Sequence, residues 1–421
     1  MKIAVVGAGN VGCAVAADLT HKHHEVALIK TTKVTHNENF EFMKNHRGLI
    51  EVWQKGDPFS ANIATVTDDM RTVADAELIY VTTVTSQHEK LIKKLRPHLR
   101  DGQIVVLTPG YISTAYFLKH CHGKDITIIE SLSSSIDCRL GEPGHVRIGS
   151  RNRQNLVGVF PKSNLKKVEP KLASLQYNYK YLNSVIEAGL HNPNLICHTI
   201  GAVMGAPRME KTTGEYCMYW ETFTPSVWNA LECLDREKLG VLKKLGLPKM
   251  TFAEAFKQEV NPTSEKTGKE VFYEFADSPT RAKGPFTLDS RYVTEDVPQG
   301  LVMLESFGKY LNVPTPICTA LIEMSSGMLG QELRADGRTV ETLGAANLNQ
   351  IIKADKLDAE RFDEAVPGNY KSKGEMDSHD RLARALGCDS YEIPKRMWEQ
   401  MQLNHKRIKA AKSDRDQTSG K

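Results

Sequence analysis

The sequence lacks the features that mark secreted, membrane-spanning and nucleic-acid-binding proteins. None of its eight cysteines forms a C-x-x-C pair, and no apolar run approaches the ~20 residues of a transmembrane helix. The formal net charge of the 421 residues is only +4, and charges of both signs are mixed along the chain. The N-terminus also lacks the basic and apolar regions of a signal peptide. We therefore expect no membrane and no nucleic-acid partner, reduced thiols and a cytoplasmic location.

Signals of metal and hydrolytic chemistry are also scarce. The run His120-Cys121-His122 cannot easily place three consecutive side chains on one ion, so we expect no metal site. The G-x-S-x-G motif of a hydrolase nucleophile does not occur. What the chain does have is length and apolar content, because 40% of its 421 residues are hydrophobic. That content is enough for a large core divided between two domains.

The opening stretch predicts a dinucleotide-binding turn. Residues 3–6 are apolar and partly β-branched, which favours a buried parallel strand, and a second strand is expected at residues 25–29. Between them stands G-x-G-x-x-G, in which Gly7 permits a tight turn, Gly9 lets a pyrophosphate approach the backbone, and Gly12 allows close helix packing. The free N–H groups of the following helix would face the phosphates. The cofactor-binding residues predicted here are Gly7, Gly9, Asn10, Val11 and Gly12.

The end of the second predicted strand favours NADP over NAD. The acid that usually holds the adenosine ribose 2′-OH is replaced by Lys30. A carboxylate would repel a 2′-phosphate, whereas Lys30 and Lys33 would attract one, and Thr31 and Thr32 offer hydroxyls to it. If both lysines are ordinary solvated loop charges, NAD remains the alternative.

Strands and helices then alternate, which predicts a parallel, doubly wound Rossmann domain. Strands are expected near residues 76–82, 102–107 and 126–129, and two more, joined by a polar turn, at 146–160. Ligands bind beyond the carboxyl ends of such strands. We therefore add Thr83, Pro109 and Gly110 to the predicted cofactor-binding residues.

The pattern changes after about residue 165, where predicted helices dominate. The fold class is therefore α/β, with an N-terminal doubly wound Rossmann domain and a mainly α-helical C-terminal domain. We assign residues 1–165 to the dinucleotide-binding domain and 166–405 to the substrate and catalytic domain. Residues 406–421 are charged and poor in apolar side chains, which predicts a flexible tail.

Two segments of the second domain offer acid–base and anion-binding side chains. His198 falls in a predicted helix that begins near Pro193, and histidine is suited to proton transfer near neutral pH. In the second segment, Arg291 offers a planar fork for a carboxylate, and Asp296 can fix the tautomer of a histidine. A structural histidine, and a surface turn in which Thr294 begins a helix, remain open as alternatives.

The chain resembles the octopine/nopaline (opine) dehydrogenase family over about residues 1–350. The resemblance rests on the glycine motif, an arginine five residues before an aspartate about a hundred residues after a histidine, and several shorter matches. These shorter matches are Pro109-Gly110, Glu130, Cys138-Arg139, Asn192-Pro-Asn, Thr224-Pro225, and Gly337-Arg-Thr. The resemblance implies that His198 and Asp296 form a catalytic dyad and that Arg291 grips a substrate carboxylate. It also implies NAD(P)H-dependent reductive condensation of an α-keto acid with an amino acid amine, giving an N-(carboxyalkyl)amino acid.

Some residues near the expected substrate crevice depart from the family pattern. Thr83 stands where the family often has proline, and the Pro-Gly loop continues with Tyr111 rather than with further glycines. Tyr219 and Thr224 are further candidates for substrate contact, and a homodimer is one candidate assembly. Two alternative functions stay open: a keto-acid or hydroxyacid reductase that uses no amine, and a nucleotide sensor without catalytic activity.

Overall fold

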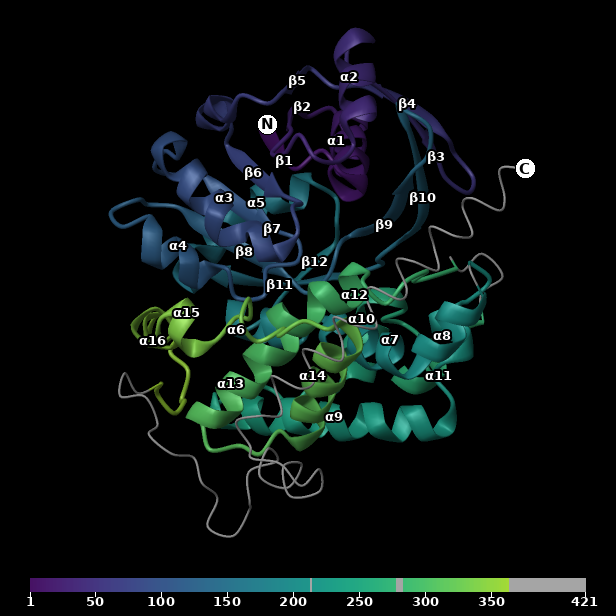
Figure 1. Cartoon of the computed structure of the whole chain (residues 1–421). Coiled ribbons are helices and arrows are strands. Elements are labelled where there is room, and N and C mark those ends of the chain that lie inside the picture. The colour runs from purple at the N-terminus through teal and green to yellow at the C-terminus, as the bar shows by residue number, and fades with distance from the viewer. Residues whose placement is uncertain (213, 278–282, 363–421) are drawn as a thin grey trace, which may run out of the picture.

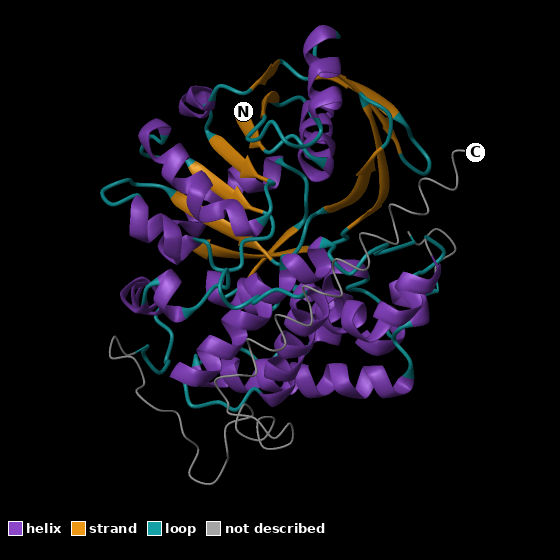
Figure 2. Cartoon of the chain, viewed as in Figure 1, coloured by secondary structure: helices purple, strands orange, loops and turns teal. Residues whose placement is uncertain are grey.

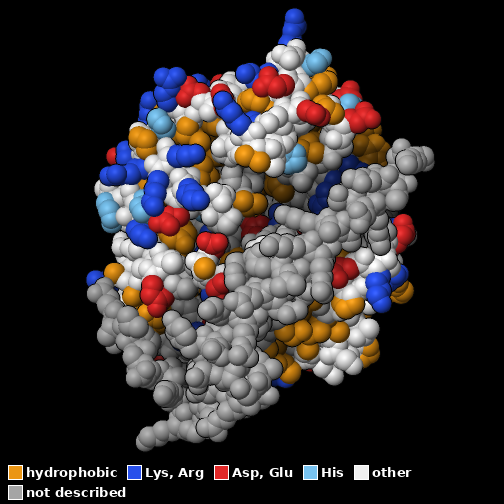
Figure 3. All heavy atoms as spheres, viewed as in Figure 1, with side chains coloured by type: hydrophobic (Ala, Val, Ile, Leu, Met, Phe, Trp, Pro, Cys, Tyr) orange, Lys and Arg blue, Asp and Glu red, His pale blue; other side chains and the backbone are white. Residues whose placement is uncertain are grey.

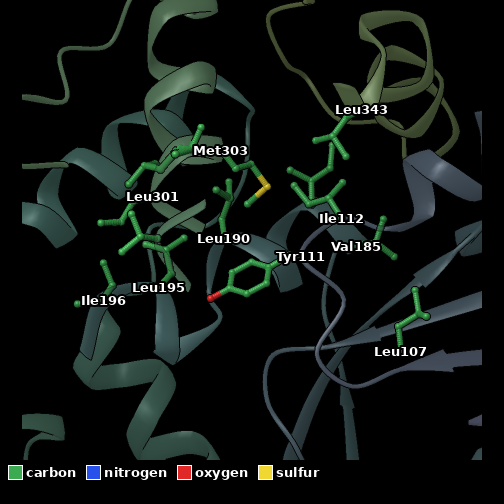
Figure 4. Packing of buried hydrophobic residues seen from close by; sticks show 14 of the residues in the cluster. Leu107, Tyr111, Ile112, Val185, Leu190, Leu195, Ile196, Leu301, Met303 and Leu343 are labelled. Atoms are coloured by element: carbon green, nitrogen blue, oxygen red, sulfur yellow. The ribbon is translucent and has the colours of Figure 1, made fainter. Parts of the chain in front are cut away.

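The structure, a computed structural model, describes residues 1–212, 214–277 and 283–362. Strands lie in the N-terminal half of the chain and helices dominate the other described residues, so Figure 2 shows a sheet-containing part above a helical part. Both parts contribute to one hydrophobic cluster. Figure 4 shows Leu107 and Ile112 of the sheet-containing part on one side of this cluster, and Leu190, Leu195 and Met303 of the helical part on the other.

An eight-stranded sheet is the centre of the N-terminal part (Figure 1). Its order is β12-β11-β8-β7-β6-β1-β2-β5, and every neighbouring pair is parallel except β11 and β8. The chain moves outward from β1 to β2 and then returns to build the other side from β6, so the predicted doubly wound α/β fold is confirmed. The strands are β1 (Lys2–Val6), β2 (Glu25–Ile29), β5 (Thr65–Thr67), β6 (Leu78–Val81), β7 (Ile104–Leu107), β8 (Thr127–Ser131), β11 (Asn155–Phe160) and β12 (Tyr179–Tyr181).

The register of the central strands places their following loops side by side. Val6 pairs with Val81, and Val81 pairs with Leu107, so β1, β6 and β7 end at the same level. The central strands are buried on both faces, as expected of a parallel sheet covered by helices. The glycine turn therefore shares one edge of the sheet with the loops that follow β6 and β7.

A separate four-stranded sheet lies beside helix α1 (Asn10–His21), as Figure 1 shows. Its order is β4-β3-β10-β9. The two strands expected at residues 146–160 exist, but β10 belongs to this small sheet, while β11 belongs to the large one. The strands of the small sheet are β3 (Leu49–Trp53), β4 (Phe59–Asn62), β9 (Ile136–Leu140) and β10 (His145–Arg151).

Helices flank the large sheet and build almost all of the second part. Near the sheet lie α1, α2 (Asn37–Asn45), α3 (His88–Leu95), α4 (Thr114–His120) and α5 (Leu165–Ser174). The helical part contains α6 (Val185–Leu190), α7 (Pro193–Thr212), α8 (Met218–Glu221), α9 (Pro225–Lys244), α10 (Phe252–Val260), α11 (Gly268–Ala276), α12 (Arg291–Thr294), α13 (Val302–Tyr310), α14 (Pro316–Leu329), α15 (Val340–Leu343) and α16 (Ala345–Ala354). A π-helical turn, η5 (Val297–Leu301), joins α12 to α13.

The large sheet continues past residue 165, because β12 pairs with β11. We propose that the two domains meet between β12 and α6, later than the sequence pattern suggests. The predicted tail at 406–421, and the last part of the predicted second domain, lie outside the described residues. No helix in the described ranges has the length and apolar content to span a membrane. On the face drawn in Figure 3, acidic side chains lie among the lysines and arginines.

Candidate active site

The glycine turn fits a bound dinucleotide. Gly7 has φ +115°, in the left-handed region that favours glycine, and a Cβ on Gly12 would lie 1.6 Å from the carbonyl oxygen of Gly7. Gly9 differs from both, because a Cβ there would meet nothing closer than the His36 ring, at 3.8 Å. Two of the glycines therefore close the turn, and the third leaves open space in front of the backbone, where a pyrophosphate would lie.

The start of α1 supports this fit. Gly9 is the N-cap and supplies no side-chain hydrogen bond, so the first N–H groups of the helix keep their capacity for an anion. Asn10 and Val11 occupy the first turn, but the Asn10 side chain accepts a hydrogen bond from Leu140 N at 2.8 Å and so fastens β9 to α1. Beside the turn, the buried hydroxyl of Thr83 makes no hydrogen bond with a described residue.

Two of the side chains predicted to bind a 2′-phosphate, those of Lys30 and Thr32, make hydrogen bonds within the loop after β2. Lys30 is buried, and its Nζ donates to Thr35 O at 2.5 Å instead of standing free. Thr31 is half-buried, and the hydroxyl of exposed Thr32 accepts from Val34 N at 3.1 Å. Sequence reasoning missed His36, whose ring borders the space in front of Gly9.

The loop after β7 is held by a buried carboxylate. Gly110 faces Glu130, because a Cβ on Gly110 would lie 1.9 Å from Glu130 Oε2. The same carboxylate accepts hydrogen bonds from the backbone of Ile112 at 2.8 Å and of Thr114 at 2.6 Å. The missing side chain of Gly110 therefore leaves room for Glu130 rather than for a cofactor, and Pro109 precedes it in the same loop.

The predicted dyad is assembled in the structure. His198 of α7 and Asp296, just after α12, are 98 positions apart, yet His198 Nδ1 lies 2.9 Å from Asp296 Oδ2. Both side chains are buried. The other carboxylate oxygen, Oδ1, accepts from the hydroxyl of Tyr111 at 2.9 Å. Because a carboxylate accepts at Nδ1, the proton of a neutral imidazole lies on Nδ1, and Nε2 is the basic nitrogen.

Aromatic rings fix the plane of the imidazole. The ring of Tyr292 stacks on His198 with centroids 3.6 Å apart and an interplanar angle of 5°. The Tyr219 hydroxyl lies 3.3 Å from His198 Nε2, the position at which a substrate proton would be exchanged. Burial lowers the pKa of His198, and the carboxylate of Asp296 opposes this shift. Burial therefore favours the neutral imidazole, which is the form that can accept a proton.

Two arginines lie near the dyad. The positive charges of Arg291, at the start of α12, and Arg139, on β9, both act to lower the pKa of His198. The carbonyl of Arg291 accepts from Glu295 N at 3.0 Å, but no hydrogen bond or ion pair joins its side chain to another described residue, so its guanidinium is available to an anion. Thr224 begins α9 as its N-cap, and no side-chain hydrogen bond joins it to another described residue. The charge of Arg291 acts on His198, and the Tyr219 hydroxyl contacts His198, so the structure places both residues at the dyad. No contact or charge of this kind connects Thr224 to the dyad within the described residues.

Two buried charged residues that sequence reasoning missed join the helical part to the sheet edge. Glu295 accepts hydrogen bonds from Thr85 N and Thr85 Oγ1, both at 2.7 Å, in the loop after β6. The guanidinium of Arg338 donates to the carbonyls of Gly110, at 2.8 Å, and Thr85, at 2.7 Å, and also to the carbonyl of Tyr111. These bonds hold the dyad against the loops that follow β6 and β7. Sequence analysis quoted Arg338 only as part of the family match Gly337-Arg-Thr, and Glu295 is marked in the sequence only by its place beside Asp296.

No group of three or more metal-ligating side chains is found in the described part of the chain. The site instead combines a dinucleotide turn with a buried histidine–carboxylate pair from a helical domain, a construction typical of two-domain dehydrogenases that use a nicotinamide dinucleotide. The helical domain carries the more specific comparison. The family model for the α-helical domain of NAD/NADP octopine/nopaline dehydrogenase matches residues 181–329, and the ketopantoate reductase model matches residues 3–161.

Curated relatives and solved structures agree with that match. An opine dehydrogenase of Arthrobacter sp. (strain 1C) is 27% identical over 355 residues, covering 82% of this chain and 95% of the relative. A vitopine synthase of Allorhizobium ampelinum is 24% identical, covering 84% and 98%. The solved structure of octopine dehydrogenase with NADH and L-arginine has the same fold, with a TM-score of 0.66 at 14% identity, covering 84% of this chain and 98% of that one. The helical-domain match, the relatives and the solved structures together support the opine dehydrogenase family for this chain, and members of that family are NAD(P)-dependent oxidoreductases acting on CH–NH bonds.

Proposed function

We propose that this protein is an NAD(P)H-dependent opine dehydrogenase. It joins the carbonyl carbon of an α-keto acid to the amine of an amino acid and reduces the product to an N-(carboxyalkyl)amino acid. The observation that carries the proposal is the 2.9 Å contact between His198 and Asp296, with Arg291 near enough for its charge to act on His198. Asp296 is joined through the Tyr111 hydroxyl to the loop after β7, at the sheet edge that also carries the dinucleotide turn. The match of the helical domain to octopine/nopaline dehydrogenase supports the same reaction.

His198 serves as the proton carrier of the condensation. An amino acid arrives as an ammonium ion, and its nitrogen becomes nucleophilic only after the proton leaves. Neutral His198 accepts that proton on Nε2, and Asp296 stabilises the resulting imidazolium through Nδ1. The imidazolium then returns a proton to the hydroxyl that leaves as water when the C=N bond forms. When bound, the nicotinamide supplies the hydride that reduces this bond.

Arg291 is proposed to bind the carboxylate of the α-keto acid. Its guanidinium fork matches the two oxygens of a carboxylate, and no described residue occupies it. Binding there would hold the carbonyl carbon beside His198 and orient one face of it towards the cofactor crevice. Holding two reactants in the right geometry can supply several kcal/mol of the reduction in the barrier between them. Tyr219 is proposed to contact the substrate at His198 Nε2, and Thr224 is kept as a weaker candidate.

We propose NADP as the preferred cofactor. The chain from Lys30 to His36 contains no acid that would repel a 2′-phosphate. Lys30 is committed to Thr35 O, but its positive charge still lies at the end of β2, and exposed Lys33 follows in the same loop. Relatives of this fold have been solved with either cofactor, octopine dehydrogenase with NADH and yersinopine dehydrogenase with NADP⁺. A preference for NADH of tenfold or more in kcat/KM would contradict the NADP proposal.

The test is a matrix of α-keto acids against amino acids, followed through NADPH absorbance and repeated with NADH. We expect oxidation only when both organic substrates are present, and a secondary amine in the products whose mass is the sum of the two substrates less one oxygen atom, because water is lost and two hydrogens are added. Turnover with a keto acid alone would instead favour a reductase without an amine substrate. The match of residues 3–161 to ketopantoate reductase is the observation behind that second candidate, but it covers the cofactor domain alone. Tight cofactor binding without turnover of any pair would favour a sensor.

A cytoplasmic setting is proposed together with this activity. None of the seven cysteines that the structure describes is in a disulfide, and five of them are buried, so the described fold does not depend on an oxidising compartment. A homodimer stays a prediction, which the mass of the protein in solution tests.

A further inference from the structure

The loop that follows Gly110 has an unusual backbone. Tyr111 has φ +49° and Ile112 has φ +63°, so two successive residues with large side chains lie in the left-handed region. Residues other than glycine are uncommon there, and each costs on the order of 1–3 kcal/mol, so the surrounding structure must hold them. This loop is also where the chain departs from the glycines expected of its family. The question is what the conformation achieves.

Two buried charged side chains hold the loop from opposite directions. The carboxylate of Glu130 accepts from Ile112 N at 2.8 Å, and the guanidinium of Arg338 donates to the carbonyl of Gly110 at 2.8 Å and to that of Tyr111. Both charged residues are buried. Removing one partner from such a buried network lowers the stability of the fold, because the charge that remains loses its hydrogen bonds. The direction of the Tyr111 side chain is therefore strongly determined.

The conformation carries the Tyr111 ring out of the cofactor domain and into the helical domain. Figure 4 shows the ring among Leu190, Leu195 and Met303, with its hydroxyl at the far end. The ring is fully buried, and a Cβ on Gly300 would lie 3.2 Å from the hydroxyl oxygen, so η5 packs closely on it. There the hydroxyl donates to Asp296 Oδ1 at 2.9 Å.

We propose that Tyr111 is a positioning residue of the catalytic site, which orients Asp296 and thereby sets the tautomer and basicity of His198. Asp296 has two carboxylate oxygens, and each has one hydrogen-bond partner among the described residues: Oδ2 accepts from His198 and Oδ1 accepts from Tyr111. Without the Tyr111 bond, the carboxylate is free to rotate about its Cβ–Cγ axis. The proposal rests on the proposed function of the dyad. It adds that a residue of the cofactor domain completes the acid–base group of the helical domain.

The hydrogen bond from the Tyr111 hydroxyl also reduces the negative charge density on the Asp296 carboxylate. A hydrogen bond to one oxygen draws charge from the other, which weakens the pull on an imidazolium at Nδ1. The charged and titratable groups around the imidazole are Asp296, Arg291, Arg139, Tyr219, Tyr292 and Cys197. Removing the hydroxyl alone leaves all of these in place, so any change in the titration of His198 is attributable to Asp296.

The decisive variant is Tyr111→Phe, which removes one oxygen and keeps the ring. We expect kcat to fall by roughly 10- to 100-fold, as for the loss of a hydrogen bond to a charged group, while the KM for NADPH stays within about twofold. We also expect the acid limb of the pH profile of kcat/KM to move upward by about 0.5 pH unit. Tyr116→Phe is the matched control, because Tyr116 is also buried and lies beside Arg338 but makes no contact with Asp296. Normal kinetics in Tyr111→Phe would overturn the proposal.

A second readout does not depend on turnover. The pKa of His198 is measured by NMR titration of labelled histidine, with its signal assigned by its loss in His198→Gln. An upward move in Tyr111→Phe, absent in Tyr116→Phe, supports the proposal, and equal values in the wild type and Tyr111→Phe overturn it. If no pair of keto acid and amino acid oxidises NADPH in the wild type, the proposed function fails, while this titration still decides the role of Tyr111.

Discussion

The sharpest test of the site is Asp296→Asn, which keeps the shape of the side chain and removes its charge. Asp296 is buried and makes two hydrogen bonds, from the Tyr111 hydroxyl to Oδ1 and from His198 Nδ1 to Oδ2. An asparagine has only one oxygen for these two donors. If that oxygen accepts from Tyr111, the amide N–H₂ faces Nδ1 and forces the proton of the imidazole onto Nε2. The basic nitrogen would then be directed away from the substrate.

The expected magnitude follows from the lost charge. A carboxylate at ~4 Å from an imidazolium contributes about 4 kcal/mol at an effective dielectric constant of ~20. Because each ~1.4 kcal/mol changes a rate tenfold, we expect kcat to fall about 10³-fold in Asp296→Asn. The pKa of His198 should also fall further, since the carboxylate that opposes its lowering is gone. Steady-state rates from pH 5 to 9, with the best pair of substrates and NADPH, measure both effects.

The appropriate control is Asp289→Asn, an exposed carboxylate in the same segment. It should keep wild-type rates, and both variants should bind NADPH with unchanged affinity, measured by quenching of protein fluorescence. A kcat for Asp296→Asn within about fivefold of the wild type would refute the reasoning, because neither tautomer control nor charge stabilisation would then limit the reaction.

Three further changes test the rest of the site. Arg291→Ala should raise the KM for the keto acid by roughly 10- to 100-fold with a smaller effect on kcat, and an unchanged KM would assign the carboxylate to another cation. Gly9→Ala should weaken NADPH binding at least about tenfold in a titration, because the new methyl group would occupy the space in front of the backbone. The unfolding temperature should stay normal, because a Cβ there meets only the His36 ring, at 3.8 Å. A lower unfolding temperature would mean that Gly9 serves the fold instead. Burial and the charge of Arg338 lower the pKa of His88 from 6.5 to about 3, so the unfolded chain binds more protons below pH 6.5. Stability from this group is therefore intact above pH 6.5 and falls by about 2 kcal/mol between pH 6.5 and 5, a decline that urea unfolding should find smaller in His88→Gln.

Local patterns predicted the cofactor domain well, because its signals lie within short segments. The apolar strand, the three glycines and the following helix occupy the first 21 residues, and each glycine has the steric role expected of it. The alternation of strands and helices likewise fixed the doubly wound sheet. It could not assign β10 and β11 to different sheets, since the pattern of a strand shows that it is paired but not with which partner.

Local sequence patterns alone could not predict the acid–base site. Histidine and aspartate 98 positions apart carry no signal of contact, so the pairing of His198 with Asp296 came from the family resemblance, and the structure now brings them together. Lys30 shows the opposite outcome. The sequence pattern placed Lys30 correctly at the end of β2. The direction of its side chain depends on a hydrogen bond to the Thr35 carbonyl, which comes within reach only when the loop is folded. Whether this lysine reaches a 2′-phosphate stays a prediction.

Sequence analysis assigned no role in the site to Arg338, Glu295 or Tyr111, and all three buried side chains join the two domains. Arg338 and Glu295 meet backbone groups of loops from the other domain, and Tyr111 meets a carboxylate of the other domain. Backbone carbonyls and N–H groups are present at every residue, so no side-chain type marks them as partners. Buried charges nevertheless tolerate little displacement, because each lost hydrogen bond leaves an uncompensated polar group. These hydrogen bonds therefore hold the two domains in one orientation at the sheet edge. The bonds that orient Asp296 also set the distance between the dinucleotide turn and His198.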